Sequence, residues 1–169
     1  MKDPQKQKVY QAEWSHSTYR GRQDFRTIGA IESWANKVVG SRWFGKLFPH
    51  MAHSPVTFSK EESTGATAYA VKNLIEISNR CHRKIIVCHE LAHLCNVDSE
   101  QFQINRVVGG LGRSKKRIVA SHGKKFAGIY LKIVEKAMGK DAARELRDNF
   151  NALGVKYDKI SVQLTRRAA

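Results

Sequence analysis

The segment from Ile85 to Cys95 constrains the fold of this chain more than any other, because its apolar residues are not confined to one face. It reads Ile-Ile-Val-Cys-His-Glu-Leu-Ala-His-Leu-Cys. Apart from two histidines and one glutamate, every residue is apolar or carries a small thiol, which is typical of a helix buried on all sides. We therefore predict a helix over residues 82–96 that is enclosed by other elements of the fold.

The three polar residues of this helix form the pattern His-Glu-x-x-His. Residues four apart lie on one face of a helix, so His89 and His93 can direct imidazole nitrogens at one zinc ion, each at ~2.0–2.1 Å. Glu90 lies beside them, where it can reach a water molecule next to the ion without binding the ion itself. From the residue counts of this chain, roughly 0.01–0.02 chance matches are expected. The alternative is a buried helix with hydrogen-bonded histidines, but burying three ionisable groups without partners costs several kcal/mol.

A catalytic zinc ion typically has three protein ligands and a fourth position for water. A histidine six residues past His93 is excluded, because that position is Ser99. Asp98 and Glu100 follow so soon that the chain would have to turn back sharply after the helix. The best candidate is His122, at the start of a predicted helix whose apolar face should pack against the His-Glu helix. The alternative is a histidine that faces solvent at a helix start.

Periodicity elsewhere predicts both strands and helices. Apolar residues alternate, or form short runs, in segments that we predict to be extended, at residues 9–16, 55–60, 67–71, 74–78 and 160–164. Helical spacing and end signals predict helices over residues 24–39, 122–138 and 141–153, with Ser121 as an N-cap and with Gly40, Gly139 and Gly154 as terminators. Strands come early and helices late, which predicts an α+β fold with a small mixed or antiparallel sheet. This sheet should pack against an N-terminal helix and the His-Glu helix, with further helices at the C-terminal end.

Length and composition predict one cytoplasmic domain. The 169 residues suit a single core, which we place at residues 8–156, with flexible or extended basic tails at 1–7 and 157–169. No apolar run reaches the roughly 18 residues that span a bilayer, and the first residues do not resemble a secretory signal. Three cysteines form no paired framework, which favours a reducing cytoplasm. We expect a monomer without a membrane partner.

The unusual feature of the composition is charge, because 30 Lys+Arg against 15 Asp+Glu give a net charge of +15. Residues 101–134 contain no acidic residue. Their basic side chains include Arg106, Arg113, Lys115, Lys116, Arg117, Lys124 and Lys125. One interpretation is a surface that docks on nucleic-acid phosphates. The other is a solvated basic face, or one that attracts acidic peptides. The glycines within residues 108–117 do not have the spacing of a phosphate-binding loop, so we do not infer nucleotide binding.

The chain resembles the small zincin-fold metallohydrolases of bacteria and phages, which are similar in outline to the SprT-like metalloproteases. The resemblance covers roughly residues 8–156. It rests on the strand Leu74-Ile75-Glu76-Ile77, the pentad His89-Glu90-Leu91-Ala92-His93 and the later His122-Gly123-Lys124-Lys125-Phe126. It implies a zincin-like fold, His122 as third metal ligand and a peptidase or other hydrolase. If the protein is encoded by a phage, the cytoplasm is that of its host.

The leading hypothesis is a zinc metallopeptidase that cleaves a peptide or protein, with proteins associated with nucleic acid as one candidate class of substrate. Zinc held by His89, His93 and His122 would lower the pKa of its water to about 7 and polarise a substrate carbonyl. Glu90 would accept the proton of the attacking water and deliver it to the leaving amine. Tyr130 is a candidate donor to the oxyanion, although packing of its ring in the core is favoured. The alternative function is a non-catalytic, zinc-stabilised protein that binds nucleic acid or a host protein through its basic surface.

Two further groups of residues favour structural roles. Cys88 and Cys95 project away from the histidine stripe, so we expect them in the core. His50 and His53 lie between Pro49 and Pro55, where we predict a loop. A second metal site there would need further ligands.

Overall fold

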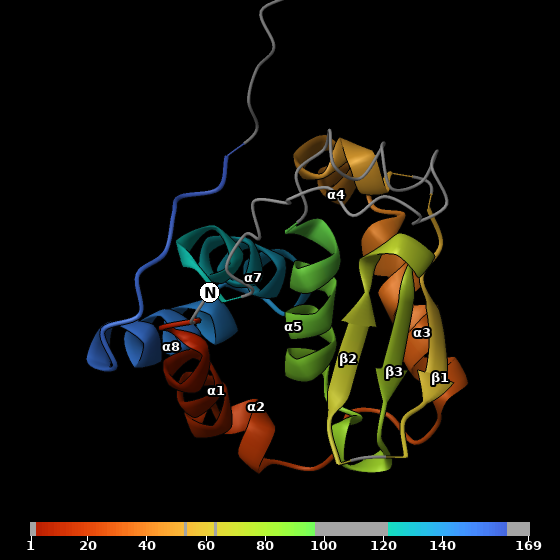
Figure 1. Cartoon of the computed structure of the whole chain (residues 1–169), viewed down its shortest axis with the longest axis horizontal. Helices are drawn as coiled ribbons and strands as arrows, with labels where there is room; N and C mark the ends of the chain where they lie inside the picture. The colour runs from red at the N-terminus through yellow and green to blue at the C-terminus, as the bar shows by residue number, and fades with distance from the viewer. Residues whose placement is uncertain (1–2, 53, 63, 97–121, 162–169) are drawn as a thin grey trace, which may run out of the picture.

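The computed structural model describes residues 3–52, 54–62, 64–96 and 122–161, which form a mixed α+β structure (Figure 1). Its α-helices are α1 (Lys6–Ser15), α2 (Ser17–Arg20), α3 (Ile28–Val39), α4 (Arg42–Leu47), α5 (Lys84–Cys95), α7 (Lys124–Ala137) and α8 (Lys140–Ala152). Its strands are β1 (Thr57–Lys60), β2 (Ala66–Tyr69) and β3 (Leu74–Ile77). Short 3-10 helices cover Pro49–Met51, Ala70–Lys72 and Asn79–Cys81. The predicted α+β class is confirmed.

The three strands form one mixed sheet in the order β1-β3-β2. Strand β3 is central, parallel to β1 and antiparallel to β2. Phe58, Ile75 and Ile77 are buried, whereas the residues that alternate with them are more exposed, so one face of the sheet contributes to the core. The sequence left open whether the sheet is mixed or antiparallel, and the structure has the mixed form.

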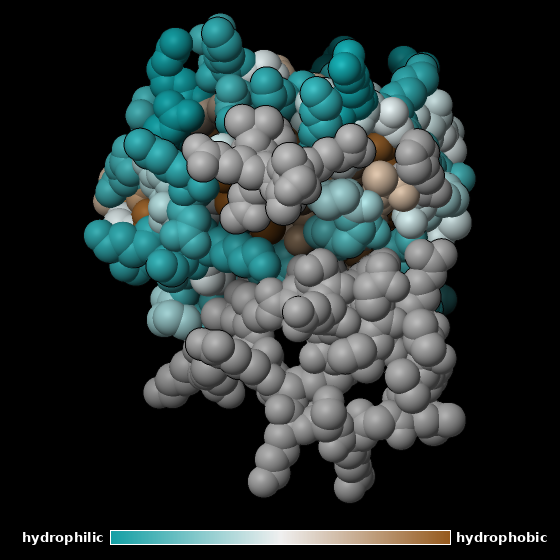
Figure 2. Space-filling view, turned by 90° about the horizontal axis from the view of Figure 1, so that it is seen from above, coloured by the Kyte–Doolittle hydropathy of each residue, from teal (hydrophilic) through white to brown (hydrophobic). Residues whose placement is uncertain are grey.

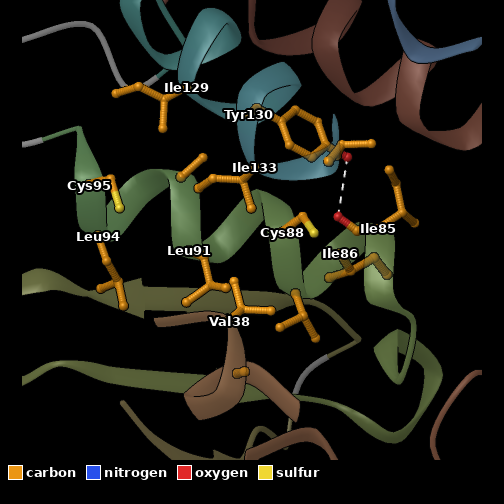
Figure 3. Packing of buried hydrophobic residues seen from close by; sticks show 14 of the residues in the cluster. Val38, Ile85, Ile86, Cys88, Leu91, Leu94, Cys95, Ile129, Tyr130 and Ile133 are labelled. Atoms are coloured by element: carbon orange, nitrogen blue, oxygen red, sulfur yellow. Dashed lines mark hydrogen bonds between the residues drawn. The ribbon is translucent and has the colours of Figure 1, made fainter. Parts of the chain in front are cut away.

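Helix α5 lies between the sheet and α7 (Figure 1). All of its residues except Lys84 and His93 are buried, so the predicted burial on all sides is confirmed. Figure 3 shows Ile129, Tyr130 and Ile133 of α7 on one side of α5, and Leu91 and Leu94 pointing away from α7. Because α5 is enclosed in this way, its polar side chains must find partners inside the protein.

The predicted strand at residues 9–16 is wrong, because this segment forms α1. Val9, Ala12, Glu13 and His16 are buried, and their spacing of three, four and seven residues is that of one helical face. Two of these four are polar, which hid the helical period in the sequence. Trp14, which the alternation placed inward, is instead 52% exposed. Helix α1 packs against α8 (Figure 1).

Three helices begin later than predicted, α3 by four residues and α5 and α7 by two residues each. Helix α3 begins at Ile28, since the Thr27 hydroxyl accepts a hydrogen bond from the Ala30 N–H at 3.2 Å. The Asp24 carboxylate, which we placed inside this helix, accepts a hydrogen bond from the Lys84 N–H at 2.8 Å, at the start of α5. Helix α7 has Gly123 as its N-cap. The predicted cap, Ser121, lies outside the described residues.

The predicted tail at residues 1–7 is wrong for the part that the structure describes, because Lys6 already belongs to α1 and Gln5 is hydrogen-bonded. The Gln5 amide accepts from the Lys156 N–H at 2.6 Å and donates to the Lys156 carbonyl at 3.1 Å. Residues 155–161 have no regular secondary structure and run beside α7, where the Asp158 N–H donates to the Lys124 carbonyl at 3.0 Å. A Cβ atom at Gly128 would lie 2.1 Å from the Asp158 carbonyl oxygen, so this close approach requires glycine.

The described surface is mostly hydrophilic in the view from above (Figure 2), as expected for a chain with this charge. Among the described helices, none combines the length and the apolar composition that a membrane span requires.

Candidate metal centre

Three histidines converge at the junction of α5 and α7. His89 and His93 lie one turn apart on α5, and His122 precedes α7, which packs against α5. The Nε2 atom of His89 lies 3.1 Å from Nε2 of His93 and 3.2 Å from Nε2 of His122. Ligand atoms of all three lie within 4.8 Å of one another, close enough to bind a metal ion. The structure therefore brings together the three residues that the sequence singled out as ligands.

The separations fit a tetrahedral ion. Ligand nitrogens at ~2.0–2.1 Å from zinc in tetrahedral geometry are about 3.3 Å apart. The two Nε2–Nε2 distances from His89 are within about 0.2 Å of that value. Carboxylate donor sets and water usually serve magnesium or calcium, whereas imidazole suits zinc and other first-row transition metals. The donor set and its spacing thus fit a zinc-like ion.

Carboxylates determine which ring nitrogens face one another. His89 Nδ1 lies 2.9 Å from the Glu13 carboxylate, and His122 Nδ1 lies 2.7 Å from the Asp3 carboxylate. In each neutral ring the Nδ1–H donates to the carboxylate, which leaves a lone pair on Nε2. Two lone pairs 3.2 Å apart repel each other unless a cation or a proton lies between them. This arrangement is the strongest physical argument for a metal ion at the point where the nitrogens meet.

Aromatic rings enclose the three imidazoles. The Phe126 ring is fully buried and lies 5.0, 4.4 and 4.9 Å from the ring centres of His89, His93 and His122. On another side, the half-buried Tyr10 ring stacks on His89 at 5.3 Å and lies 5.2 Å from His122. The spacing of His122 and Phe126 places the candidate ligand before α7 and the apolar ring within the first turn of α7. The His-Gly-x-x-Phe pattern therefore supplies both a candidate metal ligand and a ring that packs against it.

Glu13 holds the inner side of the centre. Its Oε2 atom accepts from His89 Nδ1–H at 2.9 Å and from the Tyr130 hydroxyl at 2.8 Å. The same hydroxyl lies 3.2 Å from the Ile85 carbonyl oxygen, the contact drawn in Figure 3. All of these groups are buried, so α1, α5 and α7 are joined by one hydrogen-bonded network. Tyr130 therefore packs in the core, as favoured from the sequence, and its hydroxyl already has partners away from the point where the ligands meet.

Asp3 and Gln5 hold the outer side. Asp3 Oδ2 accepts both the backbone N–H of His122 at 3.0 Å and the ring Nδ1–H at 2.7 Å. The Gln5 side-chain amide donates to the His122 carbonyl at 3.1 Å. The residues before α1 thus fix both the backbone and the ring of the third candidate ligand.

The Glu90 carboxyl is 4% exposed and lies on the side of α5 that faces β2. Burial raises its pKa to about 7, with Glu13 acting in the same direction, while His89 and a hydrogen bond from the backbone of Ala68 in β2 act to lower it. A carboxyl whose pKa lies near neutral pH can both accept and release a proton. The pKa of Glu90 therefore suits a general base, and its role as the base stays a prediction.

The three imidazoles differ in their affinity for protons. Burial lowers the pKa of His93 to about 2, and the neighbouring imidazoles act in the same direction. Burial also lowers the pKa of His122. Burial acts to lower the pKa of His89 as well, but the Glu13 carboxylate outweighs it and raises that pKa. Two of the three rings are thus held in the neutral form that metal binding requires.

The remaining residues weighed in the sequence lie apart from this centre or outside the described residues. Cys81, Cys88 and Cys95 are free and buried, as expected for core residues, and burial raises the pKa of each thiol. Asp98, Glu100 and His53 lie outside the described residues, as do Arg106, Arg113, Lys115, Lys116 and Arg117. Lys124 is exposed and lies 3.5 Å from the Asp158 carboxylate.

Sequence reasoning missed Asp3, Tyr10 and Glu13. For Glu13 a signal was present, since an acidic residue occupies the apolar face of Val9 and Ala12 at helical spacing. An ionisable residue in a core position indicates a buried partner. Asp3 carried no such signal, because it precedes the first regular element.

Comparison of the chain with models of protein families, with curated proteins and with solved structures finds no match. The resemblance to the zincin-fold metallohydrolases therefore stays a prediction, and the function must be argued from the centre itself.

Proposed function

We propose that this protein is a zinc-dependent hydrolase, most specifically a metallopeptidase. The observation that carries the proposal is the convergence of three imidazole Nε2 atoms, two of them fixed by carboxylates at Nδ1. Carboxylate–histidine pairs of this kind orient metal ligands and raise their basicity. His89, His93 and His122 would hold the ion.

Three nitrogen ligands favour a catalytic role over a purely structural one. Structural zinc sites usually have four protein ligands, whereas catalytic sites have three and an open position. Among the described residues only these three histidines group as metal ligands. A zinc ion in such a site lowers the pKa of water to about 7 and polarises a carbonyl oxygen.

The chain supplies the base. Glu90 follows the first ligand directly, and its raised pKa of about 7 suits a group that takes a proton from the attacking water and returns it to the leaving amine. The backbone N–H of Ala68 orients the carboxylate from β2. A carboxylate base beside the metal ligands has no use in a site that only joins helices, which supports hydrolysis over a structural role.

The test separates metal binding from turnover. Zinc content and cleavage of fluorescein-labelled casein are measured for the wild type, Glu90→Gln and His122→Ala, with Glu76→Gln on β3 as a matched control. We expect about one zinc per chain in the wild type, Glu90→Gln and the control. We expect cleavage to fall by at least about a hundredfold in Glu90→Gln. The His122→Ala variant should bind zinc more weakly.

Two results would contradict this assignment. Wild-type cleavage by Glu90→Gln would remove this residue as the base. Unchanged zinc affinity in His122→Ala would remove that histidine from the centre.

The basic composition favours a second candidate, a zinc-stabilised protein that binds nucleic acid and does not catalyse. The net charge of +15 would strengthen binding to a polyanion. A fluorescence titration with single-stranded and duplex DNA at several salt concentrations tests it. Affinity that falls steeply with salt, in a protein that binds zinc but cleaves nothing, would favour this candidate; no binding at low salt would end it.

A further inference from the structure

Three aromatic rings form a continuous stack from the metal centre to the surface. The Tyr10 ring lies nearly parallel to His89, with 9° between the planes and 5.3 Å between the centres. The Trp14 ring lies 6.0 Å from Tyr10 at 19°. Tyr10 and Trp14 are one turn apart on α1, on the side that does not carry Val9 and Ala12 into the core.

The outer end of this stack is open. Trp14 is 52% exposed, and Tyr69 on β2 is the other large hydrophobic side chain that stands out as exposed among the described residues. The two differ in their surroundings, because the Tyr69 hydroxyl donates to Glu76 at 3.1 Å on the sheet, whereas the Trp14 ring stacks on Tyr10. An exposed aromatic ring beside a ligand-binding centre is a surface on which another planar group can stack.

We propose that Trp14 and the exposed edge of Tyr10 bind an aromatic side chain of a peptide substrate, within a few residues of the bond that is cleaved. This inference rests on the proposed peptidase function and names its substrate class. The stack leads directly to His89, so a side chain on Trp14 would be held within a few residues of the carbonyl that reacts at the centre.

Charge favours a peptide side chain over a nucleobase. The carboxyl groups of Glu90, Glu13 and Asp3 all act on the Tyr10 hydroxyl. Asp3 is the partly exposed one of the three, so a phosphate backbone that brought a base to this stack would approach its carboxylate, whereas a neutral peptide would carry no such charge. Lys6, with its ammonium 6.0 Å from the centre of the Tyr10 ring, is the cation that the described residues place over the stack.

The test uses two small probes that do not require hydrolysis. N-acetyl-phenylalanyl-glycyl-glycine hydroxamate and N-acetyl-alanyl-glycyl-glycine hydroxamate carry the same metal-binding group and differ in the phenyl ring, which the two glycines place at the distance of Trp14. Their affinities for the zinc-loaded protein are measured by calorimetry for the wild type, Trp14→Ala, Trp14→Phe and the control Tyr69→Ala. We expect the phenyl ring to increase affinity about tenfold in the wild type and the control. This gain should be lost in Trp14→Ala and largely kept in Trp14→Phe.

The outcomes distinguish the two levels of the proposal. Equal affinity for both probes in the wild type, or a phenyl preference that persists in Trp14→Ala, overturns the aromatic subsite and leaves the metal centre intact. Failure of both probes to bind the zinc-loaded wild type overturns the subsite together with the proposed function, because the centre would then be closed to ligands. If a thymidine oligonucleotide shifts the Trp14 indole N–H signal and the phenyl probe does not, the stack binds nucleobases and the proposal is wrong.

Discussion

Two carboxylate–histidine pairs make the same contact in different surroundings. Glu13 and His89 are both buried, and they lie within α1 and α5. The Glu13 carboxylate also accepts a hydrogen bond from the Tyr130 hydroxyl. Asp3 has a side chain that is 19% exposed, and it meets His122 from a segment that precedes any helix. Both pairs leave the ligand nitrogen free to face the centre.

The difference indicates a division of roles. A buried carboxylate with two donors cannot lose one contact without leaving another group unsatisfied, so Glu13 should affect both folding and metal affinity. A partly exposed carboxylate can be replaced by water, so Asp3 should affect mainly metal affinity. The directions of the pKa shifts agree with this view, because the pKa of His89 is raised whereas that of His122 is lowered.

The largest effect is expected for Glu13→Gln. The amide keeps the size of the side chain but loses the negative charge, so its oxygen accepts the hydrogen bonds from His89 Nδ1–H and the Tyr130 hydroxyl more weakly than the carboxylate oxygen does. We expect the free energy of unfolding to fall by about 3 kcal/mol and zinc affinity to fall about 10- to 100-fold. Urea unfolding and competition with a zinc chelator measure the two quantities. A variant that loses zinc affinity at unchanged stability would break the proposed difference between the pairs.

A smaller effect is expected for Asp3→Asn, which keeps a hydrogen-bond acceptor near the ring of His122. We expect zinc affinity to fall by about tenfold and the free energy of unfolding to change by less than about 1 kcal/mol. The same chelator and urea experiments give the comparison directly. If this variant proved as unstable as Glu13→Gln, exposure would not be what separates the two pairs.

Tyr130→Phe sharpens the comparison by removing one donor from Glu13 and leaving the carboxylate. We expect a loss of about 1 kcal/mol in unfolding free energy and less than about a threefold change in zinc affinity. The same variant tests whether the hydroxyl takes part in turnover. A large loss of casein cleavage with normal zinc content would contradict the core role of this residue.

The smallest signal is the order in which the two ligand rings titrate in the metal-free protein. The pKa of His89 is raised in the folded state, so the folded protein binds this proton more tightly than the unfolded chain does. Protonation of His89 therefore stabilises the fold at pH values below about 6.5, the pKa of a free histidine. This stabilisation is lost as the pH rises through the folded-state pKa. The lowered pKa of His122 gives the opposite sign, since stability is lost as the pH falls below about 6.5 toward the folded pKa. Imidazole nitrogen NMR shifts measured against pH should place the two rings on opposite sides of that value.

The three candidate ligands could be picked out from the sequence because they lie on elements with clear patterns. His89, Glu90 and His93 occupy a helix whose burial follows from its composition, and His122 was the best remaining candidate for the third ligand. The residues that orient these ligands could not be predicted in the same way. Glu13 interrupts the apolar face that would have identified α1 as a helix, so the side chain that matters most to His89 also obscured the element that carries it.

The strands and the later helices were predicted to within a few residues, and the errors at their ends have a common cause. Asp24, for example, lies before α3 and accepts a hydrogen bond from the first residue of α5, a contact with a segment that local sequence does not identify. The mixed pairing of the sheet is likewise a long-range property, since β1 lies beside β3 and not beside β2, its neighbour in sequence.

The contacts of Asp3 with His122 and of Gln5 with Lys156 span 119 and 151 positions. Loops of that length close slowly, and on the ribosome the first residues must wait until these late partners have emerged. A nascent chain would therefore carry the His-Glu helix long before it could hold an ion tightly. Tight binding of zinc would then indicate that Asp3 and Gln5 have formed their contacts with His122 and Lys156.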